Sequence, residues 1–359
     1  MTTQADNIST LRSINQQLNN SKFKTAKEIA GWMGALQAQD YSMSKWAFGI
    51  RLQNSTEATI NTEINSGSII RTHLLRPTWH FVSSNDIYWI LGLTAPRIKA
   101  ALKYRDKQLG LTDIILNKCN GILEKSLRDY NHQTRDELIS ELKYSKIDVE
   151  DNRASHVFLR AELDGIICSG KQKEGKPTFA ILEEWVPEHK KIYREEALKE
   201  LALRYFTSHG PATIQDFTWW SGLSISDGKN ALNFNKGYLT SKVIFNQTYW
   251  MANTNLEPKP DFSEICFLPA YDEFLISYRD RTASLLLTDN KKVISNNGIF
   301  YPTLLQNGQV IGSWKRNIRN NRILLTKNLF NPGTPDQDNI FLRSIIRYSN
   351  FIGKTIELI

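Results

Sequence analysis

The sequence is poor in cysteine and in long apolar runs, and each shortage excludes classes of protein. Its three cysteines, Cys119, Cys168 and Cys266, are too far apart for a disulfide framework or a zinc site. No apolar run approaches the roughly 18 residues of a membrane-spanning helix. The first 25 residues lack the apolar block of a signal peptide. We therefore expect a cytoplasmic protein with no structural metal and no membrane partner.

Motifs for common cofactors are also missing. The chain has no Gly-rich phosphate loop, no HExxH and no CxxC pair, so we expect no cofactor. It also lacks the helix-hairpin-helix lysine pattern that would indicate a Schiff-base mechanism, although a sequence cannot exclude a nucleophilic lysine.

Basic residues are in excess. The 359 residues carry a formal net charge of +8, which favours an acidic partner, most commonly nucleic acid. Residues 310–331 hold five basic residues and no acidic one, and residues 97–108 hold five basic residues and one acidic one. On composition alone, solvated surfaces explain both runs better than a binding site does.

Helices followed by a β-hairpin recur three times along the chain. This order is typical of the winged helix, a helix-turn-helix variant with a β wing. The predicted helices, each group followed by its hairpin, are 7–18, 26–37 and 57–66 with 68–82; 134–143 and 153–165 with 169–182; and 195–210, 212–222 and 224–235 with 239–252.

After about residue 262, short β-rich segments replace this pattern. They cover 264–278, 283–289, 292–296, 298–306 and 308–314, and one helix is predicted at 334–353. Asn307-Gly308 lies between two of the segments and is a strong hairpin-turn signal. The pattern indicates a small β-barrel or sandwich.

The predicted fold class is therefore α+β, with tandem winged-helix domains followed by a C-terminal β-barrel. The domains are winged helix 1 at 1–94, winged helix 2 at 95–190, winged helix 3 at 191–260 and the barrel at 261–359. Three winged helices in a basic chain favour DNA, but this fold also binds proteins. The candidate recognition helices carry no strong basic stripe, so we do not expect them to dock as a repressor's would.

Two neutral amides one residue apart, Gln37 and Gln39, follow the predicted helix 26–37. Neither titrates, but each can bind a water, a base edge or a backbone group. Residues i and i+2 lie on opposite sides of a helix and on one face of an extended segment. If both amides bind one water, the helix must end by about Gln37. The alternative is that one glutamine caps the helix and the other is solvated.

Further candidates lie in the hairpin 68–82. Strand alternation puts Arg71 and His73 on one face, and likewise Thr78 and His80. With Arg76, they are candidates for contacts to phosphate or to an extruded base. His80 is equally well explained as a hydrogen-bonded core histidine.

Carboxylates and arginines follow one another at 272–281. Asp272 and Glu273 beside arginines can do acid–base work, but we favour a structural ion-pair network for both. Arg279 and Arg281 are candidate DNA contacts. The pair Trp219 and Trp220, in an amphipathic helix, is expected in the core.

Six segments, in this order, resemble the AlkZ-like winged-helix DNA glycosylase superfamily. They are LQAQDYSMSKWAFGIRL, IIRTHLLRPTWHFV, GKPTFAILEEWVP, RYFTSHGPATIQDFTWWSGL, FLPAYDEFLISYRDR and PTLLQNGQVIGSWKR, and the resemblance spans about residues 26–316. It implies tandem winged helices and a C-terminal barrel in a C-shape around a basic channel. It also implies excision of alkylated bases, including crosslinked ones in some members, by hydrolysis of the N-glycosidic bond.

The family's catalytic motif is Gln, an apolar residue, then Gln or, in one branch, Asp. It falls here on Gln37-Ala38-Gln39. A cationic alkylated base leaves readily as a neutral molecule, so two amides that position a water can suffice, without acid catalysis of departure. The hairpin at Asn307, with Lys315 and Arg316, resembles a family element that would probe the minor groove.

We therefore predict a monofunctional DNA glycosylase of DNA repair that acts on double-stranded DNA. The alternatives are a non-catalytic winged-helix DNA-binding regulator and a protein-interaction scaffold whose DNA affinity is incidental and salt-sensitive. The oligomeric state stays open, with a monomer as the default.

Overall fold

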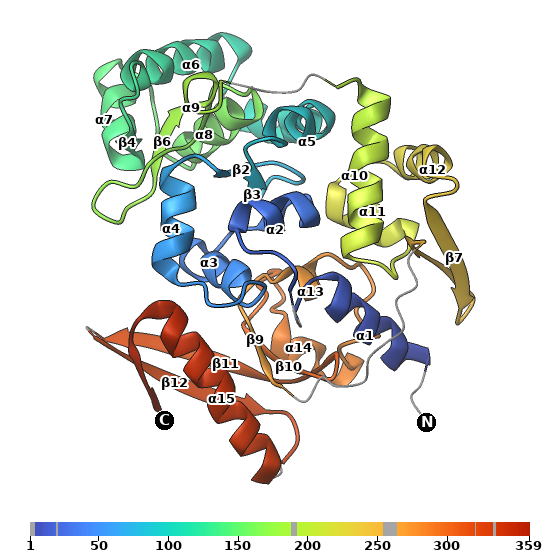
Figure 1. Ribbon diagram of the computed structural model, residues 1–359. Helices are drawn as coiled ribbons and strands as arrows, with labels where there is room; N and C mark the ends of the chain where they lie inside the picture. The colour runs from blue at the N-terminus through green and yellow to red at the C-terminus, as the bar shows by residue number, and fades with distance from the viewer. Residues whose placement is uncertain (1–3, 19–20, 188–191, 254–263, 320, 333–334) are drawn as a thin grey trace.

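Four small β-sheets and the helices between them make up the part of the chain that the structure describes (Figure 1). The computed structural model describes residues 4–18, 21–187, 192–253, 264–319, 321–332 and 335–359. The architecture is mixed α and β, and none of the helices in these ranges is long and apolar enough to cross a membrane. The predicted domain boundaries at 190 and 260 lie outside the described residues.

The N-terminal part contains a three-stranded antiparallel sheet in the order β1-β3-β2. Its strands pair in the predicted hairpin 68–82, to which the short β1 adds. The elements are α1 (Gln4–Asn15), α2 (Ala26–Met33), β1 (Leu36–Gln37), α3 (Tyr41–Gly49), α4 (Glu57–Asn65), β2 (Ile69–His73) and β3 (Trp79–Ser83).

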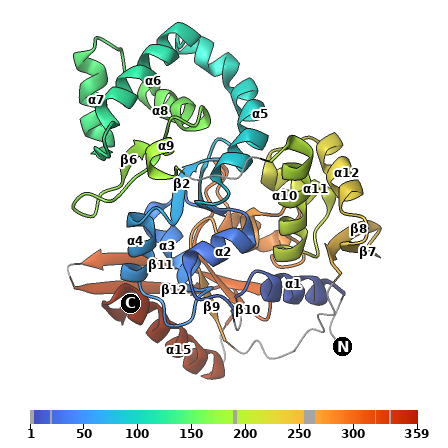
Figure 2. The same cartoon turned by 45° about the horizontal axis from the view of Figure 1, so that its top comes forward.

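The middle part has a core of its own, built mainly from helices. In both views its helices α6 and α7 lie far from the C-terminal helix α15 (Pro335–Ile352) (Figures 1 and 2). Its sheet has the order β4-β6-β5 and includes the predicted hairpin. The elements are α5 (Ile87–Gln108), α6 (Asp113–Leu127), β4 (Gln133–Thr134), α7 (Arg135–Tyr144), α8 (Arg153–Leu163), β5 (Ile167–Ser169), β6 (Thr178–Ile181) and α9 (Leu182–Trp185).

Three helices and a hairpin follow, close to their predicted positions. Capping boxes at Thr213 and Ser224 begin the second and third of these helices. The elements are α10 (Arg194–Ser208), α11 (Ile214–Ser221), α12 (Ile225–Phe234), β7 (Leu239–Ile244) and β8 (Gln247–Ala252).

The C-terminal part contains a five-stranded sheet in the order β13-β12-β11-β10-β9. Helix α15 packs on it through Phe341, which lies against Phe267, and Tyr348, which lies against Trp314. The remaining elements are β9 (Cys266–Leu268), α13 (Glu273–Ile276), η1 (Leu287–Asp289), α14 (Asn290–Val293), β10 (Thr303–Gln306), β11 (Gln309–Arg319), β12 (Arg322–Leu329) and β13 (Thr355–Leu358).

This sheet is open, which corrects the predicted β-barrel. Strands β9 and β13 lie at its two edges and do not pair with each other in the described ranges. Segments predicted as strands form the short helices α13, η1 and α14 instead. The sheet therefore keeps two separate edges in the described ranges. Strand β12, which the sequence analysis missed, is one of the sheet's longer strands.

One apolar core joins the N-terminal sheet to the C-terminal sheet. It includes Phe81 from the first sheet, Phe48 from the neighbouring helix α3, and Phe267 and Trp314 from the second sheet. The indole Nε1 of Trp46 donates a hydrogen bond to the carbonyl of Phe267 at 2.6 Å. This packing holds α13, which follows β9, against the strand that carries Gln37.

Candidate active site

The glutamine motif lies on extended chain. Helix α2 ends at Met33, and Gly34 then adopts a φ of 79°. A Cβ at Gly34 would lie 3.3 Å from the ring of Trp220, so both the conformation and the close approach favour glycine. Gln37 pairs with His80 across β1 and β3, and the Ala38 N–H donates to the Trp79 carbonyl at 2.7 Å. The helix thus ends before Gln37, as the shared-water hypothesis requires, and neither glutamine caps it.

The two glutamines have different surroundings. Gln37 is only 5% exposed. Its side-chain Oε1 accepts a hydrogen bond from Nη2 of Arg76 at 2.9 Å, and its backbone N–H donates to Oε1 of Glu273 at 2.6 Å. Gln39 is exposed and lies just before Asp40, which caps α3. The amide of Gln37 is therefore fixed, whereas that of Gln39 faces solvent.

Beside Gln37, the hairpin β2–β3 holds buried polar atoms without a hydrogen-bond partner among the described residues. They are Oγ1 of Thr72, Nε of Arg76, Oγ1 of Thr78 and Nε2 of His80. The His80 Nδ1 lies 2.9 Å from the carbonyl of Thr78, so Nδ1 carries the proton and donates. Burial, aided by the charge of Arg76, lowers the pKa of His80 to about 3. His80 is thus a neutral buried histidine with a free acceptor nitrogen.

Arg71 and His73 are engaged by other groups. Nε of Arg71 donates to the carbonyl of Ala38 at 3.0 Å, and its guanidinium lies 4.3 Å from the ring centre of Trp79. Burial lowers the pKa of Arg71 to about 10. Nδ1 of His73 pairs with the buried carboxylate of Glu162 on α8. Both residues support the strand beside the glutamines, and His73 is buried.

A half-exposed tryptophan with two arginines borders the same region. Trp219 is 41% exposed, so the expectation that it belongs to the core is wrong, while Trp220 is fully buried as expected. Neighbouring residues of a helix point in different directions, so one of two adjacent tryptophans can be exposed while the other is buried. The sequence analysis treated the two tryptophans alike. The guanidiniums of Arg76 and Arg281 lie 5.6 and 5.7 Å from the Trp219 ring centre.

Arg279 and Arg281 lie beside a hollow of about 740 Å³ that also borders the start of α11 and the hairpin β7–β8. Arg279 is exposed. Nε of Arg281 donates to the carbonyl of Leu275 at 2.8 Å, and burial lowers its pKa to about 10. Arg279 is accessible to a phosphate, whereas Arg281 is partly buried.

The turn at Asn307 is packed against another part of the protein, which the sequence analysis did not expect. Asn307 is exposed, but a Cβ at Gly308 would lie 2.6 Å from Oγ of Ser9, so the turn packs against α1. Further along β11, Lys315 is exposed. Arg316 donates from Nη2 to Oγ of Ser42 at 2.7 Å, three residues after Gln39. The structure therefore brings Arg316, but not the turn itself, towards the glutamine motif.

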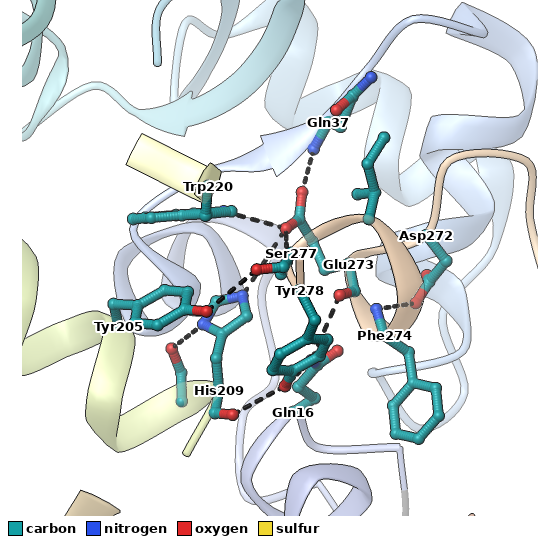
Figure 3. A network of polar contacts seen from close by, with 12 residues as sticks. Gln16, Gln37, Tyr205, His209, Trp220, Asp272, Glu273, Phe274, Ser277 and Tyr278 are labelled. Carbon is teal, nitrogen blue, oxygen red and sulfur yellow. Dashed lines mark hydrogen bonds and ion pairs between the residues drawn. The ribbon is translucent and has the colours of Figure 1, made fainter. Parts of the chain in front are cut away.

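The two neighbouring carboxylates have separate roles. Asp272 accepts two hydrogen bonds of 2.8 Å from the buried Arg51, which confirms the structural ion pair expected for it. Glu273 contacts Gln37 instead, and it also accepts from Nε1 of Trp220 at 3.1 Å and from Oγ of Ser277 (Figure 3). Sequence reasoning missed this contact. The signal available was that Glu273 lies in one of the six family segments.

Burial alone would raise the pKa of Glu273. The neighbouring His209 and Ser277 outweigh burial, and the pKa falls to about 2. Nε2 of His209 lies 3.7 Å from the Glu273 carboxylate, and burial lowers the pKa of this histidine. At neutral pH the Glu273 carboxylate is therefore ionised, with the His209 ring as its neighbour.

Comparisons with known proteins agree on one family. The family model described as "DNA glycosylase AlkZ-like" matches residues 30–351. An interstrand DNA cross-link repair glycosylase from Streptomyces sahachiroi is 23% identical over 315 residues, which cover 81% of this chain and 82% of that protein. The solved structure of Streptomyces sahachiroi DNA glycosylase AlkZ matches with a TM-score of 0.82 at 18% identity, over 100% of both chains. At that identity the match is a likeness of fold.

Proposed function

The chain belongs to the AlkZ-like DNA glycosylase family, and we propose that it excises cationic alkylated bases from double-stranded DNA as a monofunctional enzyme. As a member of this family it is a DNA glycosylase, a hydrolase that acts on N-glycosidic bonds. The match covers every candidate site residue, from Gln37 to Arg316.

The observation that carries the proposal is how the Gln37 amide is held. Arg76 fixes its side-chain oxygen and Glu273 fixes its backbone N–H. A carbonyl oxygen has two lone pairs, so Oε1 can still accept a hydrogen bond from a water. The exposed Gln39 lies two residues further along the chain and would hold the same water from the DNA side.

Two amides suit a substrate whose base already carries a positive charge. Alkylation at N7 of guanine or N3 of adenine creates such a base, which departs as a neutral molecule without an acid. The transition state resembles a sugar oxocarbenium ion, as in other glycosyl transfers, and a positioned water then completes hydrolysis. The curated relative is named for interstrand cross-link repair, which adds crosslinked bases to the candidate substrates.

We further propose that three groups of helices, each followed by its hairpin, are winged helices that line a basic channel in a C-shaped molecule. The hairpins are β2–β3, β5–β6 and β7–β8. The exposed Arg279 and Lys315 would contact phosphates, which fix register without reading sequence. The nucleotide would then be distorted or flipped to reach Gln37. The working unit would be a monomer.

The test is base release by the wild type from duplexes that differ only in the charge of the damaged base. One duplex carries N7-methylguanine and the other a neutral damaged base such as uracil. We expect release of N7-methylguanine only, and an abasic product that breaks only after alkali. Efficient release of the neutral base would contradict the two-amide mechanism. No release from this duplex or from a crosslinked one would favour a non-catalytic DNA-binding protein.

A further inference from the structure

A buried, ionised carboxylate lies directly behind the strand that carries Gln37. Glu273 is 1% exposed. Its Oε1 accepts the backbone N–H of Gln37 at 2.6 Å, and its Oε2 accepts from the indole of Trp220 and the hydroxyl of Ser277. These donors come from β1, from α11 and from the residue that follows α13, three places far apart in the sequence (Figure 3).

Within the described ranges, no lysine or arginine forms an ion pair with this carboxylate, although the charges of Arg51 and Arg76 both interact with it. The basic group recorded beside it is His209, whose Nε2 lies at 3.7 Å and whose pKa is lowered by burial. Nδ1 of His209 lies 2.8 Å from the Ser208 hydroxyl, and its ring stacks on Tyr205. Arg51, which lies nearby, is committed to Asp272. Glu273 therefore keeps its negative charge inside the protein.

The field of this charge reaches the residues around Gln37. Burial lowers the pKa of Arg76, and Glu273 is the strongest influence in the opposite direction. Burial and Arg76 lower the pKa of His80, and Glu273 again opposes them. The negative charge of Glu273 thus influences the groups across β1, where the side chain of Gln37 contacts Arg76.

A site made only of amides and Arg76 has no group to balance a developing sugar cation, and Arg76 would oppose it. We propose that Glu273 is the positioning residue of the excision reaction, which fixes the Gln37 strand and offsets the positive charge that develops on the sugar. This inference rests on the proposed function. Glu273 forms no bond to the sugar and takes no proton. The N-glycosidic electron pair leaves with the base, and water adds to the sugar carbon.

The charge term can be separated from a structural role with two abasic nucleotides of similar shape. One is a pyrrolidine nucleotide, which is protonated and mimics the sugar cation, and the other is a neutral tetrahydrofuran nucleotide. Two opposite unit charges about 10 Å apart, at an effective dielectric constant of about 20, attract each other with an energy that corresponds to a roughly tenfold change in affinity. We therefore expect the wild type to prefer the charged duplex, and Glu273→Gln to lose about tenfold of that preference.

The matched control is Asp106→Asn, which removes a buried carboxylate of the middle part that pairs with Arg160 and His156 and contacts neither Gln37 nor Glu273. It should keep the preference, measured by fluorescence anisotropy on the folded fraction. A Glu273→Gln protein that binds both duplexes as the wild type does would overturn the inference. So would a wild type with no preference for the charged analogue.

A second variant keeps the carboxylate and is expected to fold. Ser277→Ala removes one hydrogen bond that lowers the pKa of Glu273. Because the variant keeps the charge, it should keep the wild-type preference for the charged duplex. A loss of preference as large as that of Glu273→Gln would show that the hydrogen-bond network, and not the charge, sets the preference, and would overturn the inference.

Base release from N7-methylguanine duplex, measured in parallel, separates the two claims. Release that is equally fast in wild type and Glu273→Gln refutes only this inference. No release by the wild type from alkylated or crosslinked duplexes refutes the proposed function and this inference with it.

Discussion

Replacement of Arg76 tests whether the Gln37 amide must be held in one orientation. Nη2 of Arg76 donates to Oε1 of Gln37 at 2.9 Å. Rotation of the amide by half a turn would bring its NH₂ group against the guanidinium, so this bond selects one orientation. In Arg76→Ala the amide loses that constraint, and the oxygen that would orient the water is no longer fixed.

A hydrogen bond to a charged group contributes about 1.5–3 kcal/mol. If the transition state loses all of this hydrogen-bond energy in Arg76→Ala, the single-turnover rate at saturating protein should fall by about 10- to 150-fold. Arg76→Lys keeps the charge but not the planar fork, and should fall between Arg76→Ala and the wild type. The substrate is N7-methylguanine duplex, and released base is measured over time.

The control is Lys143→Ala, which removes an exposed lysine paired with Glu150 at 3.0 Å on the distant middle part. It should react as the wild type does. If Arg76→Ala reacts at the wild-type rate when protein is saturating, the amide needs no fixed orientation and the reasoning is wrong. A change in affinity alone would assign Arg76 to DNA binding.

Four further outcomes are expected. Asp272→Asn leaves Arg51 buried without its carboxylate and should lower the free energy of unfolding in urea by about 3–5 kcal/mol; a loss below about 1 kcal/mol would contradict this. Gly34→Ala places a side chain on a residue with a φ of 79° and should lower the free energy of unfolding by about 1–3 kcal/mol; an unchanged free energy of unfolding would show that this backbone strain is absent. His80 has a folded pKa of about 3 against 6.5 in the unfolded chain. Between these values only the unfolded chain binds the proton, so unfolding free energy should decrease as pH falls through this window, and His80→Asn should flatten that slope. Trp219→Ala removes a 41% exposed indole and should weaken lesion-duplex binding by about tenfold, the scale of one base–aromatic stack; affinity is measured on the folded fraction, because the indole also donates to the Ile276 carbonyl.

Local signals were enough to predict the hairpins and many of the helices, but not α3, α5 and α6. The capping box at Thr134 begins α7 where it was expected. Asn307-Gly308 forms the turn between β10 and β11, with φ values of 50° and 75°. Alternation in 68–82 and 239–252 predicted β2–β3 and β7–β8. Each of these depends on neighbours a few residues apart, which is the information that one sequence contains.

The predictions that failed depended on distant packing. Short apolar runs at 271–296 can form either strands or short helices, and in the structure they are helical and pack in the core shared with the N-terminal part. Asp272 and Glu273 are adjacent and chemically alike, so the same role was predicted for both. Glu273 differs because it meets Gln37 across 236 residues of chain. No local pattern contains that contact.

The most direct test of the central claim is base release from N7-methylguanine duplex by the wild type, Gln37→Ala and Gln39→Ala. Strand breaks after alkaline treatment report release, and duplex affinity is measured on the same proteins. We expect release by the wild type and a loss of about 100-fold or more in each variant, the scale seen when one positioned polar group is removed, with affinity unchanged. If both variants release the base at the wild-type rate, the assignment of the water to Gln37 and Gln39 is wrong.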